Sequence, residues 1–108
     1  MSAFKIWFPD LHKAIHSDNQ EAVRKWIKSM SETSIAIALG YAGEENDVKA
    51  LESMISNGAN VNAKDFWNAT SLHRASESNS LDAMELLIAK GAEVNAKDDW
   101  ERTPLHKR

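Results

Sequence analysis

Two histidines four residues apart are the clearest candidates for chemistry in this chain of 108 residues. His12 and His16 lie in a stretch predicted to be helical, and their spacing places both rings on one helix face. Two imidazoles on one face can ligate one metal ion. The sequence supplies no third ligand at a recognisable spacing, so we expect no metal and give both histidines a structural role.

Other reaction chemistries lack the residues that they need. The sequence has no cysteine, which excludes disulfides, thiolate nucleophiles and cysteine metal sites. It also has no glycine-rich phosphate loop and no Gly-x-Ser-x-Gly motif. We therefore expect a protein that is not an enzyme and that needs no cofactor.

The composition predicts one small globular domain over residues 1–108. Apolar residues make up 43% and charged residues 27% of the chain. The net charge of −3 conceals an acidic middle, because residues 31–101 carry five basic and thirteen acidic groups. Such a middle repels a phosphate backbone, so nucleic acid is not the expected partner. No apolar run reaches the length of about 20 residues that a membrane span needs, and no export signal is recognisable, so we expect a cytoplasmic protein, or one in a host cytosol if it is an effector.

An internal repeat organises the chain. The segment Gly58–Asp65 recurs as Gly91–Asp98, 33 residues later, with seven of the eight positions identical. The segment Thr70–His73 recurs as Thr103–His106 at the same offset. Two matches at one period indicate a repeat architecture, in which each unit stacks on its neighbours.

Each unit is predicted to contain two helices. The hydroxyl of Thr103 can cap a helix N-terminus, Pro104 suits the first helical position, and Thr70 provides the same cap one unit earlier. One face of the second helix is predicted from the apolar spacing of Leu81, Met84, Leu87 and Ile88. Gly91 then suits a C-cap with positive φ. Residues 94–97 are predicted to be a non-helical connection to the next unit.

The same register extends toward the N-terminus. In the second unit, apolar residues occupy all the core positions, which are Leu39, Ala42, Val48, Leu51, Met54 and Ile55. Leu11 matches Leu39 at an offset of only 28, so the first connection is five residues shorter than the 33-residue period. We expect Trp26 to be buried on the second helix of the first unit. We also expect Trp7 and Phe8 to cover the open N-terminal end of the stack.

The register also decides one ambiguous segment. Residues 35–39 alternate large and small side chains, as a strand does, but the register places them in a helix that contains Gly40. The predicted units are therefore residues 4–31, 32–64 and 65–97, with a partial fourth unit over residues 98–108.

This pattern resembles the ankyrin repeat family, with its 33-residue period and its T-P-L-H-x-A motif. The resemblance implies an all-α solenoid of stacked antiparallel helix pairs with β-hairpin-like fingers. It places His12, His73 and His106 at the position where the family uses histidine to brace neighbouring loops. Departures include Ser71 for the motif proline and Gly40 for the histidine, with Asn68 and Glu101 at the usual turn glycine. Because glutamate adopts positive φ reluctantly, we expect a strained or altered turn at Glu101.

The resemblance implies a non-enzymatic protein-interaction module. Members of the family usually bind a protein partner through the finger tips and the inward faces of the first helices. In this register the implied finger-tip contacts are Phe66, Trp67, Ala69, Asp99, Trp100 and Arg102. The implied contacts on the inward helix face are Glu44, Glu45, Glu77 and Ser78, with His16 and Ser17 in the first unit. An acidic strip beside aromatic rings suits a partner with a basic segment.

Alternatives stay open at this stage. The indole rings of Trp67 and Trp100 can pack on neighbouring fingers and have no binding role. The chain can also be a dedicated inhibitor or immunity-type protein that blocks another protein, or a regulatory fragment of a larger ankyrin-containing enzyme or effector. We expect a monomer, unless an exposed face of the last repeat self-associates.

Overall fold

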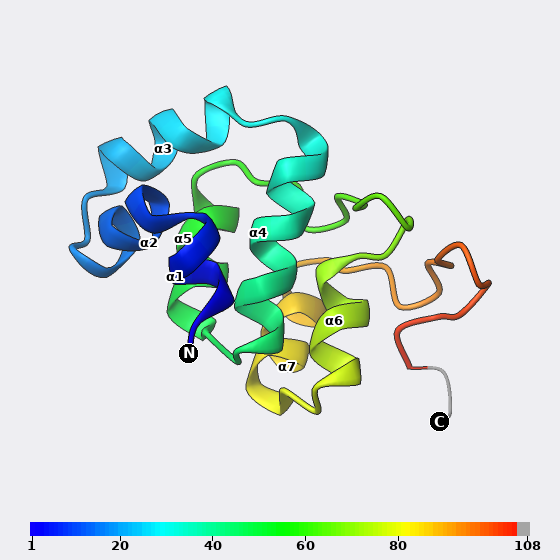
Figure 1. The fold of residues 1–108 in the computed structure, drawn as a ribbon. Coiled ribbons are helices and arrows are strands. Elements are labelled where there is room, and N and C mark those ends of the chain that lie inside the picture. The colour runs from blue at the N-terminus through cyan, green and yellow to red at the C-terminus, as the bar shows by residue number, and fades with distance from the viewer. Residues whose placement is uncertain (106–108) are drawn as a thin grey trace.

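The computed structural model describes residues 1–105, and these form a stack of helix pairs (Figure 1). The helices of this part of the chain are α1 (Ala3–Trp7), α2 (Pro9–His16), α3 (Gln20–Ser29), α4 (Glu32–Glu44), α5 (Val48–Ser56), α6 (Ser71–Glu77) and α7 (Leu81–Ala89). The pairs α2/α3, α4/α5 and α6/α7 correspond to the three predicted units. None of the described helices has both the length and the apolar character needed to cross a membrane.

One continuous apolar core runs through the stack. Leu39 from α4, Leu51 from α5, Leu72 from α6 and Leu87 from α7 are fully buried. Leu39 and Leu72 are one 33-residue period apart, and so are Met54, which is also fully buried, and Leu87. The predicted register is therefore confirmed at these positions of the second and third repeats. Each pair buries its apolar face against the next, as a solenoid requires.

Local signals start and stop the helices where the sequence predicts. Thr70 caps α6: its hydroxyl accepts a hydrogen bond from the His73 N–H, and His73 Nδ1 accepts one from the Thr70 N–H. Gly91 follows α7 with a φ of 97°, a conformation open to glycine. Residues 35–39 are helical within α4, so the register and not the local alternation was the better guide.

Helices α4 and α6 form the most extensive helix contact of the stack. A Cβ atom at Gly40 would lie 3.3 Å from the Cγ atom of Arg74 on α6. Glycine at this position therefore leaves room for the Arg74 side chain to lie across the inward face of α4. This packing gives a reason for the departure from the motif histidine at Gly40.

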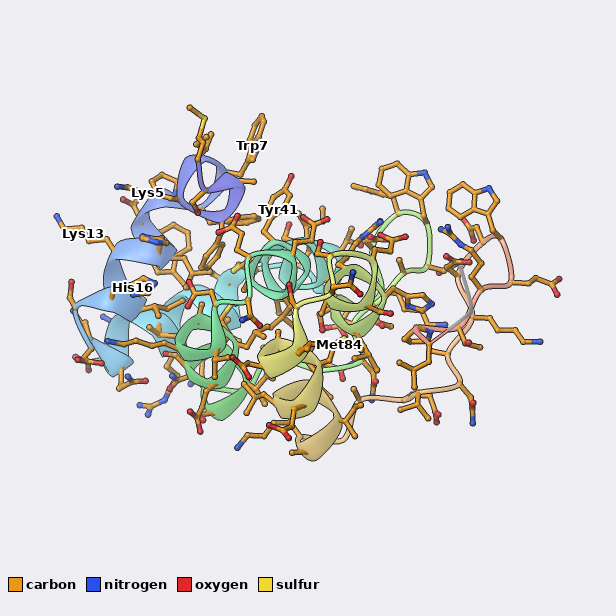
Figure 2. All side chains as sticks on the ribbon, turned by 90° about the horizontal axis from the view of Figure 1, so that it is seen from below. Lys5, Trp7, Lys13, His16, Tyr41 and Met84 are labelled. Atoms are coloured by element: carbon orange, nitrogen blue, oxygen red, sulfur yellow. The ribbon has the colours of Figure 1, made fainter. Side chains whose placement is uncertain are left out.

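The N-terminal end differs from the regular pattern. Helix α2 packs on α3 and α5, while the short helix α1 packs on α2 and α4. The expectation that Trp7 covers this end is wrong: Trp7 lies in α1 and projects from the body of the protein (Figure 2). Phe4 covers the end instead and is fully buried, with half-buried Phe8 packed beside it.

The outer helices also bury fewer residues than their spacing predicts. Trp26 is 40% exposed, so its predicted burial is wrong: α3 turns Val23 and Ile27 into the core and leaves the indole at the margin. On α7, Leu81 and Ile88 are exposed, and Leu87 and Ala83 are the buried residues. The predicted face of α7 was too wide, because none of the described elements lies against its far side.

The connections after α5 and α7 are the fingers of the fold. They lie on one side of the stack in Figure 1, and the described residues contain no strand in either of them. Each finger is closed by a backbone hydrogen bond, from Asp65 N–H to the Ala69 carbonyl at 3.0 Å and from Asp98 N–H to the Arg102 carbonyl at 3.1 Å. The predicted helix of the fourth unit, with its motif histidine His106, lies largely outside the described residues.

Two adjacent residues of α7 test this core. Leu87 is 0% exposed and Ile88 is 44% exposed. We expect Leu87→Ala to lower the free energy of unfolding by about 2–5 kcal/mol, because it leaves a cavity. Ile88→Ala is the matched control and should cost less than about 1 kcal/mol. Urea denaturation followed by circular dichroism measures both, and equal losses would contradict the register.

Candidate functional site

Each finger is organised around one aspartate carboxylate. Oδ1 of Asp65 accepts hydrogen bonds from the backbone N–H groups of Trp67, at 2.9 Å, and Ala69, at 3.0 Å. One period later, Oδ1 of Asp98 accepts from the N–H groups of Trp100 and Arg102, both at 2.9 Å. The carboxylate fixes the turn, and the turn places an aromatic side chain at its tip.

Neighbouring fingers are joined to each other. The carbonyl of Trp67 accepts a hydrogen bond from the Asp99 N–H at 2.9 Å, and the Asn68 amide donates to Oδ1 of Asp99 at 2.7 Å. Since His73 Nδ1 accepts from a backbone N–H, its Nε2 carries the proton and donates to the Arg102 carbonyl at 2.8 Å. His73 therefore braces the next finger, as its motif position implies.

The tips expose three large aromatic side chains. The exposed fractions are 73% for Phe66, 48% for Trp67 and 59% for Trp100. Arginines lie over both indoles: the guanidinium carbon of Arg74 is 6.0 Å from the Trp67 ring centre, and that of Arg102 is 5.1 Å from the Trp100 ring centre. The rings are therefore held by cation–π contacts and still present open surface.

A groove runs between the inward helix face and the first of these fingers. It has a volume of about 330 Å³. Its lining comes from α4, the 65–67 tip and α6, and comprises Ala36, Ile37, Gly40, Tyr41, Glu44, Asp65, Phe66, Trp67 and Arg74. The volume is within the range of sites that accept small ligands or a few side chains.

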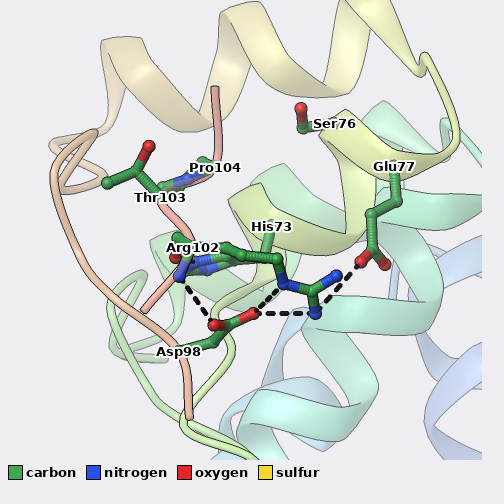
Figure 3. Close-up of a pocket in the computed structure, with 7 residues that line it drawn as sticks. All are labelled: His73, Ser76, Glu77, Asp98, Arg102, Thr103 and Pro104. Atoms are coloured by element: carbon green, nitrogen blue, oxygen red, sulfur yellow. Dashed lines mark hydrogen bonds and ion pairs between the residues drawn. The ribbon is translucent and has the colours of Figure 1, made fainter. Parts of the chain in front are cut away.

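The charges near the groove are more balanced than the sequence suggests. Arg74 forms ion pairs with Asp65 at 2.7 Å and with Glu77 at 3.3 Å. Arg102 pairs with Asp98 at 2.9 Å and with Glu77 at 3.7 Å (Figure 3). The neighbouring cavity shown in Figure 3 has a volume of only about 60 Å³, too small for a partner's side chain.

The predicted contact residues therefore differ in their availability. Glu45 is engaged at the N-terminus of α1, where its carboxylate accepts from the Ser2 hydroxyl at 2.7 Å and from the Phe4 N–H at 3.0 Å. Ala69 is buried inside its finger, while Ser78 is exposed.

Glu44 is the acidic residue of the groove that keeps its charge unpaired. It has no hydrogen bond or ion pair from its side chain among the described residues. Burial raises the pKa of its carboxyl; Arg74 opposes this shift, while Glu77 and Glu45 add to it. Apart from the attraction of Arg74, its carboxylate has no nearby cation that stabilises it, and a cation of a partner can supply further stabilisation.

A second cluster lies at the other end of the stack. His16 Nε2 is 3.2 Å from Oδ2 of Asp47, and the centres of the His12 and His16 rings are 4.4 Å apart. The histidine pair was visible in the sequence, but Asp47 is 31 residues from His16 and no pattern linked the two. Burial lowers the pKa of His12, and His16 lowers it further, while Asp47 acts in the opposite direction.

Comparison with known proteins agrees with the repeat pattern. The chain matches a family model described as ankyrin repeats (3 copies) over residues 11–98. No curated protein gives a significant match to the chain.

The two finger turns provide a matched test of backbone strain. Asn68 and Glu101 occupy equivalent positions, and both have a φ of 59°. This conformation costs glutamate about 1 kcal/mol and asparagine less. We expect Glu101→Gly to raise the free energy of unfolding by up to about 1 kcal/mol. Asn68→Gly should give no such gain, because it relieves less strain and also removes the hydrogen bond from the Asn68 amide to Asp99. Chemical denaturation measures both, and a larger gain from Asn68→Gly would contradict the assignment of strain.

The finger carboxylate should make stability depend on pH. Burial raises the pKa of the Asp98 carboxyl, but hydrogen bonds from Arg102 and Trp100 outweigh it and hold the pKa below its usual 3.8. A lowered folded-state pKa stabilises the fold above the unfolded-state pKa, and this contribution disappears as the pH falls through the folded value. We expect Asp98→Asn to cost about 1–3 kcal/mol at pH 7 and less near pH 2.

Urea denaturation between pH 2 and pH 7 measures this dependence. Asp82→Asn removes an exposed carboxylate from α7 and serves as the control for the loss of one charge. A cost of Asp98→Asn that does not change over this pH range would show that the ionised carboxylate does not stabilise the finger.

Proposed function

Because the chain belongs to the ankyrin repeat family, whose repeats generally bind other proteins, we propose that it is a non-enzymatic module for binding a cytosolic protein partner. The partner presents an extended segment with a basic residue, and this segment lies in the groove between the inward face of α4 and the 65–67 finger tip. Trp100 and Asp99 extend the contact surface onto the next finger.

The observation that carries this proposal is the combination of an open groove with fixed aromatic rings. Phe66 and Trp67 line the groove, and the guanidinium of Arg74 lies over the Trp67 indole. Tryptophan is enriched among the residues that dominate binding energy, and a ring that is already ordered loses little entropy on binding. This arrangement favours a binding role for the rings over a purely structural one.

The charge pattern favours a basic group on the partner. Glu44 lines the groove without an ion pair among the described residues, whereas Arg74 neutralises Asp65 and Glu77. A lysine or arginine of the partner placed beside Glu44 supplies the missing counter-charge. Complementary charge mainly accelerates association, and buried aromatic contacts mainly slow dissociation.

Selection from a displayed library of random peptides tests the proposal. We expect peptides with a basic residue next to an apolar one to be enriched on the wild-type protein. For these peptides, Trp67→Ala should raise the dissociation rate by about tenfold or more, since truncation of a central tryptophan costs at least about 2 kcal/mol. Glu44→Lys should lower the association rate, measured by surface plasmon resonance.

Matched variants separate the groove from the rest of the surface. Trp26→Ala removes another exposed indole on α3, and Glu85→Lys reverses an exposed charge on α7. Both should leave the rates close to wild type. Peptides whose binding is weakened by Trp26→Ala and not by Trp67→Ala would overturn the assignment to the groove.

A further inference from the structure

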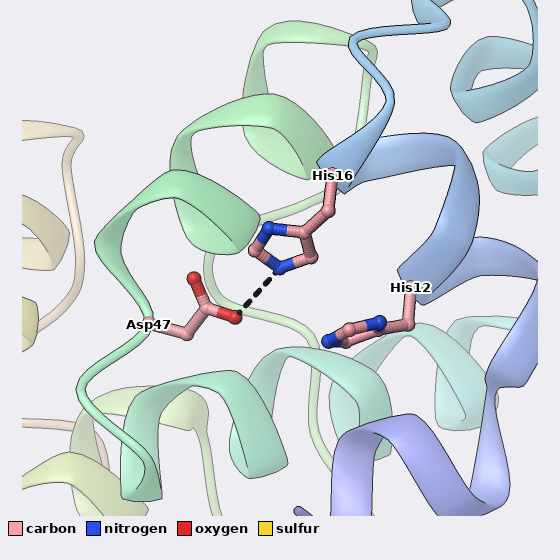
Figure 4. A group of neighbouring side chains, drawn as sticks. All are labelled: His12, His16 and Asp47. Atoms are coloured by element: carbon pink, nitrogen blue, oxygen red, sulfur yellow. Dashed lines mark hydrogen bonds and ion pairs between the residues drawn. The ribbon is translucent and has the colours of Figure 1, made fainter.

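The cluster of His12, His16 and Asp47 lies apart from the groove. His12 and His16 come from the last two turns of α2, and Asp47 precedes α5. The figure shows the two rings and the carboxylate directed toward one another across the gap between these helices (Figure 4). One ligand atom from each residue lies within 4.8 Å of the other two.

Each of the three side chains has a ligand atom to offer. Oδ1 of Asp47 caps α5 by accepting from the Ala50 N–H at 3.1 Å, which leaves Oδ2 directed at His16. His12 makes ring contacts with Phe4 and His16, and its ring nitrogens have no hydrogen-bond partner among the described residues. The cluster is partly exposed, so an ion can reach it from solvent.

The repeat pattern explains why His12 does not brace a finger. In the third unit, the histidine at the same position, His73, is bonded to the following finger through the Arg102 carbonyl. After the first unit the chain is five residues shorter, and α4 begins at Glu32, two residues after the C-cap of α3. Among the described residues no finger stands next to α2 for His12 to brace.

One unit later, the contact that corresponds to the His16–Asp47 contact involves no histidine ring. There Ser80 occupies the position of Asp47, and its hydroxyl donates to the carbonyl of Glu44 at 3.0 Å. The junction between α4 and the start of α7 is therefore made without an imidazole or a carboxylate. Two imidazoles and a carboxylate at the first junction exceed what that packing requires.

We propose that His12, His16 and Asp47 bind a divalent transition-metal ion, with zinc as the reference ion, that joins α2 to the start of α5. Imidazole nitrogen and carboxylate oxygen are ordinary zinc ligands, and three of them leave a fourth position for water. Ligand atoms about 2.0–2.1 Å from a tetrahedral zinc ion lie about 3.4 Å from one another. The distance of 3.2 Å between His16 Nε2 and Asp47 Oδ2 already fits. The ligand atom of His12 lies within 4.8 Å of the other two, and rotation of its side chain toward them completes the set.

Binding replaces a proton by the ion. In the hydrogen bond, the proton of His16 lies on Nε2, between that nitrogen and Oδ2 of Asp47. When zinc takes this place on a neutral ring, the displaced proton is carried by solvent to Nδ1, and the carboxylate stays ionised. Asp47 continues to cap α5 through Oδ1, so the ion crosslinks two repeats without breaking a cap.

Titration of the metal-free protein with zinc chloride tests the proposal. We expect isothermal titration calorimetry to give one zinc ion per chain, and the melting temperature to rise as zinc is added, because the ion binds the folded state. Magnesium should give no comparable rise, since it prefers a shell of oxygen ligands. Cobalt(II) should give the visible absorption of a four-coordinate ion.

Three variants remove one ligand each. Asp47→Asn keeps a good helix cap, and His12→Phe keeps a ring beside Phe4, so both should fold without zinc; His16→Gln removes the third ligand. Each should weaken zinc binding by about tenfold or more. Asp82→Asn, on α7, is the control and should bind zinc like the wild type. Circular dichroism and melting without metal confirm that each variant is folded.

The results have clear meanings. One-to-one binding that is weakened in all three ligand variants and retained in Asp82→Asn supports the site. Absence of binding at millimolar zinc, an equal effect of magnesium, or unchanged affinity in folded ligand variants would overturn it. The readout does not involve a protein partner, so it is independent of the proposed groove.

Discussion

Burial of apolar side chains between consecutive helix pairs holds the stack together and sets the positions of its fingers. Leu39, Leu51, Leu72 and Leu87 fill successive positions of one core, and none of them is accessible to solvent. A single pair of short helices cannot bury such residues by itself. Stacking fixes the inward helices side by side, and only then do the fingers have a defined place at which to meet.

The fingers provide the surface at which we propose that a partner binds. The carboxylates of Asp65 and Asp98 accept hydrogen bonds from the backbone N–H groups of their turns, and His73 links one finger to the next by a hydrogen bond. Most polar groups near the groove are used in this way to hold the turns and the arginines. What remains for a partner is the exposed ring surface of the tips and the unpaired carboxylate of Glu44. The proposed binding role rests on these groups and less on the total number of acidic residues.

The N-terminal end shows how a repeat changes when its connection shortens. Loss of five residues removes the finger that would follow α3, and α1 packs on α4 at this end of the stack. Helix α2 then lies against α5, which brings its two histidines to Asp47. The motif histidine of the third unit, His73, braces a finger, whereas that of the first unit, His12, has no finger beside it and lies next to His16 and Asp47.

The repeat period, the helix pairs and their caps were predictable from the amino-acid sequence, because these depend on local spacing and on residues such as Thr70 and Gly91. The sequence also identified the aromatic tips, through their place in the period. The burial of Phe4 and the exposure of Trp26 became known from the tertiary structure, since these depend on which helix lies opposite. The tertiary structure also showed which carboxylates near the groove are neutralised and that Asp47 meets His16, because docking of the helix pairs sets these distances between residues far apart in the chain.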